Sequence, residues 1–503
     1  MSSTRIVRLV PLALSLAAGP VAAQNAAQNA AQHSALSSAA IDSTVARLFA
    51  LNMSPGFGIV VVRDTQVLYM KGFGYADVEQ RRAFTPQTVF YVASTTKAFT
   101  GLAAAILDGQ GRFRLDAPLK QYLPQAKLRP PLDPDSITIR SLLTHTHGIG
   151  GGPVELRLAY TGEYTGNDQL VALLAEHPAL DSRAYRYSNL GYNIAALAMD
   201  RVTGESWKRT LDRLIFTPLG MRNTTATISG VAPDRLAMPY RVRPTAFERV
   251  PFGKVDANMQ SAGGLVTTLE DEARWLEAQL NDGKLDGRQV IPAAAMRETH
   301  KQQVSFTQNV RGVKVTGYGF GWNVGTLNGD TILTHGGGFP GFATHISFLP
   351  QRHIGVVTFA NNEELGSALA ELAAQAVYGL ARGEPAISPD SLAALSKFID
   401  GARQSMKAEL DRRAQRPQTL PLPIDAYTGR YESPVMGSLV FSRRPDGKLE
   451  ARAGAATSAV EVYDGAKHQL RVELFGNGAV VTMEVEGDRV VAAAFNGVRY
   501  RKV

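Results

Sequence analysis

The stretch YVASTTKAF, residues 91–99, places a serine and a lysine three positions apart among small and apolar neighbours. Apolar residues then recur at helical spacing as far as Ile106, which predicts a buried helix that begins near Ser94. Residues three positions apart share one face of a helix, so the Lys97 amine can reach the Ser94 hydroxyl. Burial would lower the pKa of Lys97, and a neutral amine can accept the hydroxyl proton. The spacing therefore predicts an activated serine nucleophile.

A Ser-x-x-Lys pair also arises by chance in a chain of this length, so further stretches must carry the interpretation. The segment YRYSNLGYN, 185–193, passes into an apolar run that predicts a helix from Asn189. A tyrosine beside a lysine can act as a general base, and an asparagine amide can hold both ends of a substrate amide. Alternatively, Tyr187 is a packed side chain and Asn189 caps the helix.

The segment TILTHGGGFPGF, 331–342, runs from a β pattern into His335 and three glycines. Glycines in or beside a strand often mark the close approach of another backbone or of a ligand. A free strand N–H here can pair with the N–H of Ser94 as an oxyanion hole, which stabilises a tetrahedral intermediate. The alternative is a flexible turn with a histidine whose hydrogen bonds are satisfied locally.

In this order and with these separations, the three stretches resemble the penicillin-recognising serine hydrolases. The similarity is greatest to the branch of class C β-lactamases, D-alanyl-D-alanine carboxypeptidases, D-aminopeptidases and related carboxylesterases. Ser-x-x-Lys is a catalytic motif of this superfamily. The resemblance covers about residues 41–385 and extends to four more stretches, SLLTHTHGIG (141–150), FTPLGMRNT (216–224), SAGGLVTTLEDEARW (261–275) and GYGFGW (317–322).

The resemblance implies three catalytic residues. Ser94 would be the nucleophile that becomes acylated, and Lys97 would tune it and share its proton. Tyr187 would serve as general base, first for Ser94 and then for water. No cofactor is implied, and His145 and His147 alone are too few ligands to indicate a zinc site.

The resemblance also implies a substrate-binding set. Asn189 would orient the substrate amide, and His335 would hydrogen-bond toward Tyr187 or a substrate carboxylate. Gly337 is placed with them in the substrate-binding set. The backbone N–H groups of the nucleophile and of Gly338 would form the oxyanion hole.

The third motif departs from the pattern of the family, because His335-Gly336-Gly337 stands where many lactamases carry Lys-Thr-Gly. A histidine is mostly neutral at pH 7 and attracts a substrate carboxylate less than lysine does. Gly336 also lacks the hydroxyl that would bond that carboxylate. We therefore expect a peptidase, amidase or esterase that acts on small D-amino-acid peptides, amides or esters, with cell-wall peptides among the candidates. A β-lactamase and a penicillin-binding sensor that acylates without turnover are the two alternatives.

The expected fold is an α/β (α+β) domain of the β-lactamase/transpeptidase type at 41–385, with an antiparallel sheet flanked by helices and a helical subdomain. Two β-runs in 56–77, joined at Asp64-Thr65, predict a hairpin. The β pattern returns at 317–360, after a helix-rich stretch. A sheet built from the first hairpin and these late strands is the simplest arrangement.

The C-terminal part of the chain has a different pattern. A helical linker is expected at 386–419, where it ends in a proline-rich break. Six short, evenly spaced strands follow, and tight hairpins are marked at Pro445-Asp446-Gly447 and Gly487-Asp488. This spacing predicts a small antiparallel, lipocalin-like β-barrel at 420–503, since closure removes free strand edges.

The N-terminus, MSSTRIVRLVPLALSLAAGPVAAQ, has the pattern of a secretory signal at 1–23. Arg5 and Arg8 precede an apolar run that is too short to span a bilayer, and small residues favour cleavage after about Ala23. A low-complexity tether follows at 24–40. The mature protein is therefore expected in the periplasm or outside the cell.

Composition narrows the remaining classes. Of the 503 residues 45% are hydrophobic and 19% charged, as in a soluble globular protein with a large core. The absence of cysteine excludes disulfides, thiolate metal sites and a cysteine nucleophile. The net charge of +8 is spread along the chain, so we expect no nucleic-acid partner and no stable membrane span. No Gly-x-Ser-x-Gly elbow occurs, which excludes an ordinary α/β-hydrolase.

Overall fold

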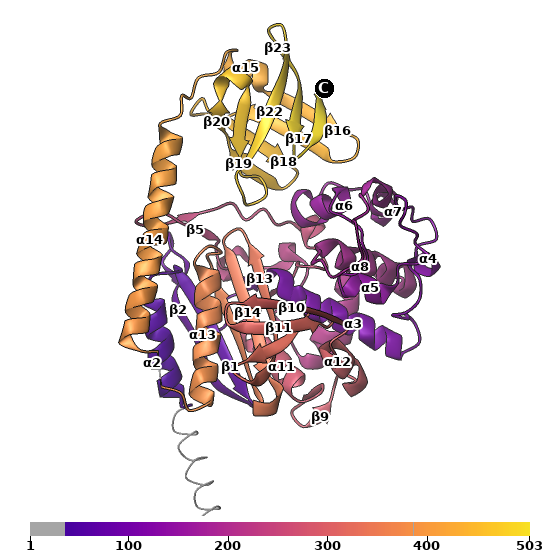
Figure 1. Cartoon of the computed structure of the whole chain (residues 1–503), viewed down its shortest axis with the longest axis vertical. Helices are drawn as coiled ribbons and strands as arrows, with labels where there is room; N and C mark the ends of the chain where they lie inside the picture. Colours follow the sequence, from indigo (N-terminus) through magenta and orange to yellow (C-terminus); the bar gives the residue numbers. More distant parts are fainter. Residues whose placement is uncertain (1–35, 386) are drawn as a thin grey trace, which may run out of the picture.

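The computed structural model describes residues 36–385 and 387–503. It consists of a body, in which a large sheet is packed between helices, and a C-terminal barrel joined to the body by one long helix (Figure 1). The signal predicted at 1–23 and most of the tether predicted at 24–40 lie outside the described residues. In the part of the chain that is described, no helix is both long and apolar enough to cross a membrane.

The sheet of the body joins strands from both ends of the domain. Its strands are β1 (Gly56–Arg63), β2 (Gln66–Asp77), β3 (Arg82–Ala83), β10 (Val304–Val310), β11 (Val313–Tyr318), β12 (Asn323–Leu327), β13 (Asp330–Phe339), β14 (Phe342–Leu349) and β15 (Ile354–Ala360). Their hydrogen-bonded order is β10-β11-β12-β13-β14-β15-β1-β2-β3, with antiparallel pairing throughout. The predicted hairpin lies next to the late strands, so the predicted arrangement and fold class are confirmed.

Strand β1 shows why both faces of this sheet are covered. Successive side chains of a strand point to opposite faces. Phe57, Ile59 and Val61 belong to the apolar cluster on one face, whereas Val60 and Val62 belong to the cluster on the other. A continuous apolar run of this kind can be buried only between two layers of helices.

The helices form those two layers and a lateral subdomain. They are α2 (Ser38–Phe49), α3 (Thr96–Gly109), α4 (Leu119–Tyr122), α5 (Ile139–Leu143), α6 (Pro153–Leu156), α7 (Asn167–Ala172), α8 (Asn189–Thr203), α9 (Trp207–Leu211), α10 (Thr217–Leu219), α11 (Leu269–Leu280), α12 (Ala293–His300), α13 (Gly366–Ala381) and α14 (Pro389–Ala414). α2 and α13 pack together on one face of the sheet, and α11 lies against β1 on the other. Helices α4 to α8 form the subdomain at the right of Figure 1.

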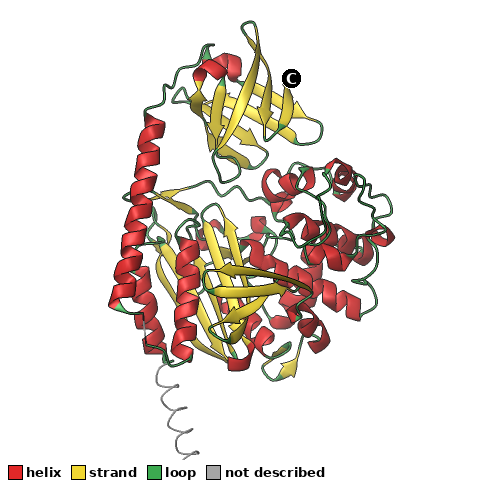
Figure 2. Cartoon of the chain, in the orientation of Figure 1, coloured by secondary structure: helices red, strands yellow, loops and turns green. Residues whose placement is uncertain are grey.

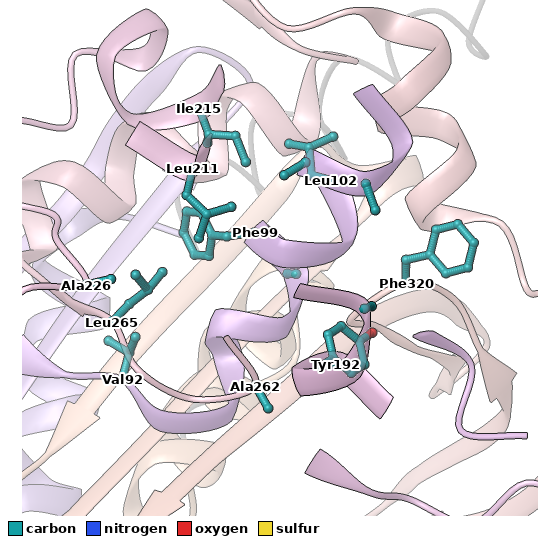
Figure 3. Packing of buried hydrophobic residues seen from close by; sticks show 14 of the residues in the cluster. Val92, Phe99, Leu102, Tyr192, Leu211, Ile215, Ala226, Ala262, Leu265 and Phe320 are labelled. Carbon is teal, nitrogen blue, oxygen red and sulfur yellow. The ribbon is translucent and has the colours of Figure 1, made fainter. Parts of the chain in front are cut away.

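Helix α3, which follows the Ser94 turn, is buried along almost its whole length. Phe99 and Leu102 lie in the same apolar cluster as Leu211, Ile215 and Leu265 (Figure 3). Burial of each large apolar side chain contributes about 1.5–3 kcal/mol to folding. The start of α3 is therefore fixed by the core of the domain, and this rigidity positions the side chains at its N-terminus.

The C-terminal barrel is a nearly closed antiparallel sheet, almost entirely strand in Figure 2. After α15 (Ile424–Tyr427), its strands are β16 (Gly429–Ser433), β17 (Gly437–Arg443), β18 (Leu449–Ala453), β19 (Ala456–Ala459), β20 (Glu461–Asp464), β21 (Gln469–Val472), β22 (Ala479–Glu486), β23 (Arg489–Phe495) and β24 (Val498–Lys502). The order β19-β18-β17-β16-β24-β23-β22-β21-β20 leaves β19 and β20, adjacent in sequence, as its two edges. The predicted barrel is confirmed; β16, β19 and β24 were not predicted, and the pairing of β16 with β24 joins the two halves of the sheet.

Two segments differ from the expected organisation. Residues 38–40, expected in the tether, form the first turn of α2, with Ser37 as its cap. α14 is more than a linker, because Ile399 is buried against the body and Arg403 donates to the carbonyl oxygen of Asn52. Periodicity alone does not show whether a polar helix of this kind packs on a neighbour.

Candidate active site

The turn that carries Ser94 is shaped by a strand beneath it. Ala93 adopts a φ of +47°, a left-handed conformation that is uncommon for a residue with a side chain. β13 crosses under this turn so closely that a Cβ on Gly337 would lie 2.3 Å from the Val92 carbonyl oxygen and 3.3 Å from Ser94 N. Only glycine fits this crossing. The third motif thus supports the turn that presents the nucleophile.

Lys97 is completely buried, and its amine contacts three oxygens. Nζ lies 3.1 Å from Ser94 Oγ, 2.7 Å from Asn189 Oδ1 and 2.8 Å from the Ala262 carbonyl oxygen. The last two oxygens can only accept, so each of them takes one N–H. A neutral amine has two N–H bonds and one lone pair, so the lone pair of Lys97 then points at the Ser94 hydroxyl. The predicted pair is therefore in hydrogen-bond contact, with a geometry suited to proton transfer.

The electrostatics of the pair involve Glu155, a residue of α6 that sequence reasoning missed. Burial lowers the pKa of Lys97 from 10.5 to about 7, and the charge of Glu155 opposes this shift. Burial raises the pKa of Glu155, while the charge of Lys97 and hydrogen bonds with the side chain and backbone of Asn189 lower it. Near pH 7 a large fraction of Lys97 is thus the free amine. A lone glutamate after a glycine-rich loop gives no sequence signal of this contact.

Tyr187 lies beside the same amine, with Lys97 Nζ 4.8 Å from its ring centroid. The side chain is 44% exposed overall. The surroundings of its hydroxyl are nevertheless buried, which raises the pKa of Tyr187, and a hydrogen bond with Ser94 acts in the opposite direction. Since the phenol is protonated near pH 7, Lys97 is the better first acceptor of the Ser94 proton. The resemblance had implied Tyr187 in that role.

Asn189 is the first residue of α8 but not its cap. The cap is Ser188, whose Oγ accepts from Leu190 N at 3.1 Å. Asn189 Oδ1 instead accepts from Lys97. The structure thus brings Asn189 to the catalytic pair.

His335 is buried and engaged on both ring nitrogens. Nδ1 lies 2.7 Å from the Gly336 carbonyl oxygen, so it must donate, and Nε2 accepts from the Tyr318 hydroxyl at 3.1 Å. Burial, followed by the charge of Lys97, lowers the pKa of His335 to about 3. The ring lies 6.0 Å from that of Tyr187 between centroids, and its nitrogens are taken elsewhere. Tyr318 and Gly336 therefore occupy the two nitrogens of His335, which leaves neither for the expected hydrogen bond toward Tyr187 or a substrate carboxylate.

Ser94 and Gly338 line one small cavity of about 40 Å³, together with Tyr160 and Phe339. The two residues expected to supply the oxyanion hole are thus on the same cavity. Gly337 is not part of its lining, because neighbouring residues of a strand face opposite ways and this one faces the Ser94 turn. Of the described side chains that line the cavity, none is cationic or anionic.

A second buried lysine, Lys254, lies behind the wall of this cavity and was also missed. Its Nζ donates to the Ala159 carbonyl oxygen at 2.6 Å and lies 4.1 Å from the Phe339 ring centroid and 5.2 Å from that of Tyr91. All three of these neighbours line the Ser94 cavity. Burial lowers the pKa of Lys254 to about 7. An isolated lysine in a loop sequence gives no sign of such burial.

No metal centre is formed by the described ranges, 36–385 and 387–503: they hold no group of three or more His, Asp or Glu side chains placed for one. His145 and His147 have local hydrogen bonds instead. His145 Nδ1 accepts from the backbone N–H of Ser188 at 3.1 Å, and His147 Nδ1 accepts from that of Ile149 at 3.0 Å. His145 therefore supports the loop before α8, and His147 supports the loop that follows α5.

Comparison with known proteins shows the family and the fold of the chain. The Beta-lactamase family model matches residues 41–379. Among curated proteins, the chain is 27% identical over 414 residues to the unguisins hydrolase ungD' of Aspergillus campestris, covering 77% of this chain and 74% of that protein.

Two solved structures show the same fold. The octameric penicillin-binding protein homologue of Pyrococcus abyssi aligns with a TM-score of 0.58 and 21% identity, over 92% of this chain and 99% of that one. EstCE1, described as a hydrolase with promiscuous acyltransferase activity, aligns with a TM-score of 0.58 and 24% identity, over 68% of this chain and all of that one. The first alignment extends well beyond the catalytic body.

Proposed function

The chain belongs to the Beta-lactamase family of hydrolases, and we propose that it hydrolyses small amides, peptides or esters through an acyl-enzyme on Ser94. One observation carries the proposal. The Lys97 amine lies 3.1 Å from Ser94 Oγ, with Asn189 Oδ1 and the Ala262 carbonyl oxygen occupying its other hydrogen-bond positions. This arrangement is the structural signature of a nucleophile with its base.

In the first step, Ser94 Oγ attacks the substrate carbonyl carbon while its proton passes to Lys97. The carbonyl oxygen becomes an oxyanion, for which the N–H groups of Ser94 and Gly338 are the candidate donors. Collapse of this intermediate breaks the bond to the leaving amine or alcohol. The leaving group takes the proton back from Lys97, with the Tyr187 hydroxyl as a relay, and an ester on Ser94 remains.

In the second step, a water attacks the ester carbonyl and gives its proton to the same Lys97 and Tyr187 pair. Ser94 Oγ then leaves and recovers a proton, and the free acid is released. Each proton that leaves the nucleophile or the water is returned to a departing oxygen or nitrogen. The cycle therefore needs no other reactant.

The charges around the nucleophile favour a peptidase, amidase or esterase over a β-lactamase. A β-lactam carries a carboxylate, and a cation is the natural partner for it. Here His335 is neutral with both nitrogens engaged, and the cavity lining supplies no cation among the described residues. We propose export to the periplasm or the exterior on the sequence pattern of residues 1–23.

Turnover of a substrate panel tests this function. Ser94→Ala should abolish hydrolysis of p-nitrophenyl acetate and of D-alanine p-nitroanilide, whereas Ser391→Ala, an exposed serine on α14, should leave both rates unchanged. Nitrocefin should be hydrolysed far more slowly than the ester. Undiminished ester hydrolysis by folded Ser94→Ala would remove this residue from the reaction, and rapid nitrocefin turnover would favour the lactamase.

A further inference from the structure

The Ser94 cavity is too small to hold a substrate. Its volume is about 40 Å³. A cavity needs roughly 10–15 Å³ to hold one water, so this one has room for only a few heavy atoms. The reacting carbonyl fits, but the rest of an acyl group must lie elsewhere.

A much larger cavity, of about 690 Å³, lies next to it, between the body, α14 and the barrel. Tyr160 and Phe339 line both cavities. Small-molecule sites usually have about 300–1,000 Å³ and occur preferentially between domains. The larger cavity has the size of a binding site, and it adjoins the cavity of the nucleophile across the walls that Tyr160 and Phe339 form.

The barrel supplies one wall of this cavity through the segment 474–478. The ring of Phe475 packs against that of Tyr160 with centroids 4.9 Å apart. At the next residue, Gly476, a Cβ would lie 2.7 Å from Pro340 of the body. The barrel segment thus fits closely against the two body segments that separate the cavities.

The barrel is also anchored beside the helical turn that carries Tyr160. Glu163 accepts hydrogen bonds from the backbone N–H of Ser438 at 3.0 Å and from its hydroxyl at 2.7 Å. Thr161 accepts at its carbonyl oxygen from Ala455 N at 2.9 Å. These bonds fix the barrel wall relative to the catalytic body.

Glu363 is one of the carboxylates on this cavity that form no ion pair with a described residue. Several of the other charged groups there pair with one another, for example Arg241 with Glu473 and Arg413 with Glu461. Glu363 has no ion pair and no side-chain hydrogen bond to any described residue, and its Oε1 lies 2.8 Å from where a Cβ of Gly338 would be. Its carboxylate is therefore directly beside β13, the strand that carries Gly338.

We propose that the larger cavity binds the acyl part of the substrate, a short peptide segment that carries a protonated amine. Leu474 and residues 476–478 of the barrel form one of its walls, Phe475 supports that wall by packing against Tyr160, and Glu363 is the counter-charge for the amine. This inference rests on the proposed acyl transfer at Ser94 and names its substrate class. The barrel is then part of the substrate site, and its loop 474–478 selects for acyl chains that are too long for the Ser94 cavity.

Paired substrates test the inference separately from the chemistry. The probes are p-nitrophenyl acetate, which needs only the small cavity, and p-nitrophenyl esters of a tri-alanine peptide in D and L forms, with a free or an acetylated amine. Phe475→Ala should lower kcat/KM for the free peptide ester about five- to tenfold, because Tyr160 loses the ring that supports it in the wall of the larger cavity, and should leave acetate hydrolysis unchanged. Phe398→Ala, on an exposed face of α14, is the matched control.

The charge is tested by Glu363→Gln, which should lower kcat/KM for the free-amine ester about tenfold and leave the acetylated ester unchanged. If neither the peptide rate nor the acetate rate changes in Phe475→Ala, the role of the barrel is overturned. If both rates fall by the same factor it is overturned as well, since the segment would then only support the fold. If wild-type protein hydrolyses none of the esters, the proposed function fails first.

Discussion

The two buried lysines of the body are alike in their titration and different in their contacts. Burial lowers the pKa of both Lys97 and Lys254 to about 7, and neither forms an ion pair within 4 Å with any described residue. Lys97 touches a hydroxyl that can lose a proton, whereas Lys254 touches only backbone carbonyl oxygens and aromatic faces. A perturbed pKa therefore does not identify a catalytic group; the atom that the amine faces does.

The sharpest test of this contrast is the loss of each amine in turn. Lys97→Met should slow acylation by about 10²–10⁴-fold, since the Ser94 proton loses its acceptor. Lys254→Met keeps the acceptor and should lose only a small fraction of the rate, through its effect on the cavity wall. Burst-phase kinetics with a p-nitrophenyl ester measure both. Equal losses in the two variants would show that Lys97 has no special role.

The pH dependence of acylation should follow Lys97 alone. The reactive form is the free amine, so the rate should rise with pH through a midpoint near 7 and be roughly tenfold below its plateau at pH 6. Lys254→Met should show the same midpoint. A profile that is flat between pH 6 and 9 in the wild-type protein would exclude an amine of this pKa as the base.

In contrast, the two lysines should contribute equally to the pH dependence of the free energy of unfolding. Between about pH 7 and 10.5 each lysine is protonated in the unfolded chain and neutral in the folded one, so the free energy of unfolding rises with pH in this range. Each Lys→Met change should therefore reduce that slope by about 1.4 kcal/mol per pH unit. Urea denaturation at several pH values measures it. A slope that changes in only one variant would mean that the other lysine stays charged when folded.

The smallest effect is expected from Glu155. Its charge raises the pKa of Lys97, so Glu155→Gln should shift the acylation midpoint to lower pH. The glutamine side chain has a similar shape to the glutamate that it replaces. The acid limb of the rate profile, recorded beside that of Lys254→Met, measures the shift. A shift to higher pH would show that Glu155 does not act on Lys97 through charge.

The sequence was informative where local pattern and family resemblance act together. The hairpin at β1 and β2, the helix after Ser94 and six strands of the barrel each have a periodicity or a turn that can be read directly. Ser94, Lys97 and Asn189 meet because two motifs 92 residues apart in sequence are packed by one core. Spacing within each motif suggested the chemistry, and the resemblance supplied the pairing.

The rest depends on contacts that leave no local trace. Glu155, Lys254 and Tyr160 reach the site from loops and short helical turns whose sequences look solvated. The neutral state of His335 depends on which groups happen to face its two nitrogens, and the position of Phe475 depends on how the barrel docks. Such features follow from tertiary packing and could not be predicted from residue spacing.

The most direct measurement is intact-mass spectrometry of the protein trapped in mid-reaction with a slowly released acyl donor, followed by peptide mapping. We expect one added acyl group on the peptide that contains Ser94, present in wild-type protein and in Lys254→Met but absent from Ser94→Ala. An acyl group on any other residue, or an adduct that persists in folded Ser94→Ala, would contradict the assignment of the nucleophile.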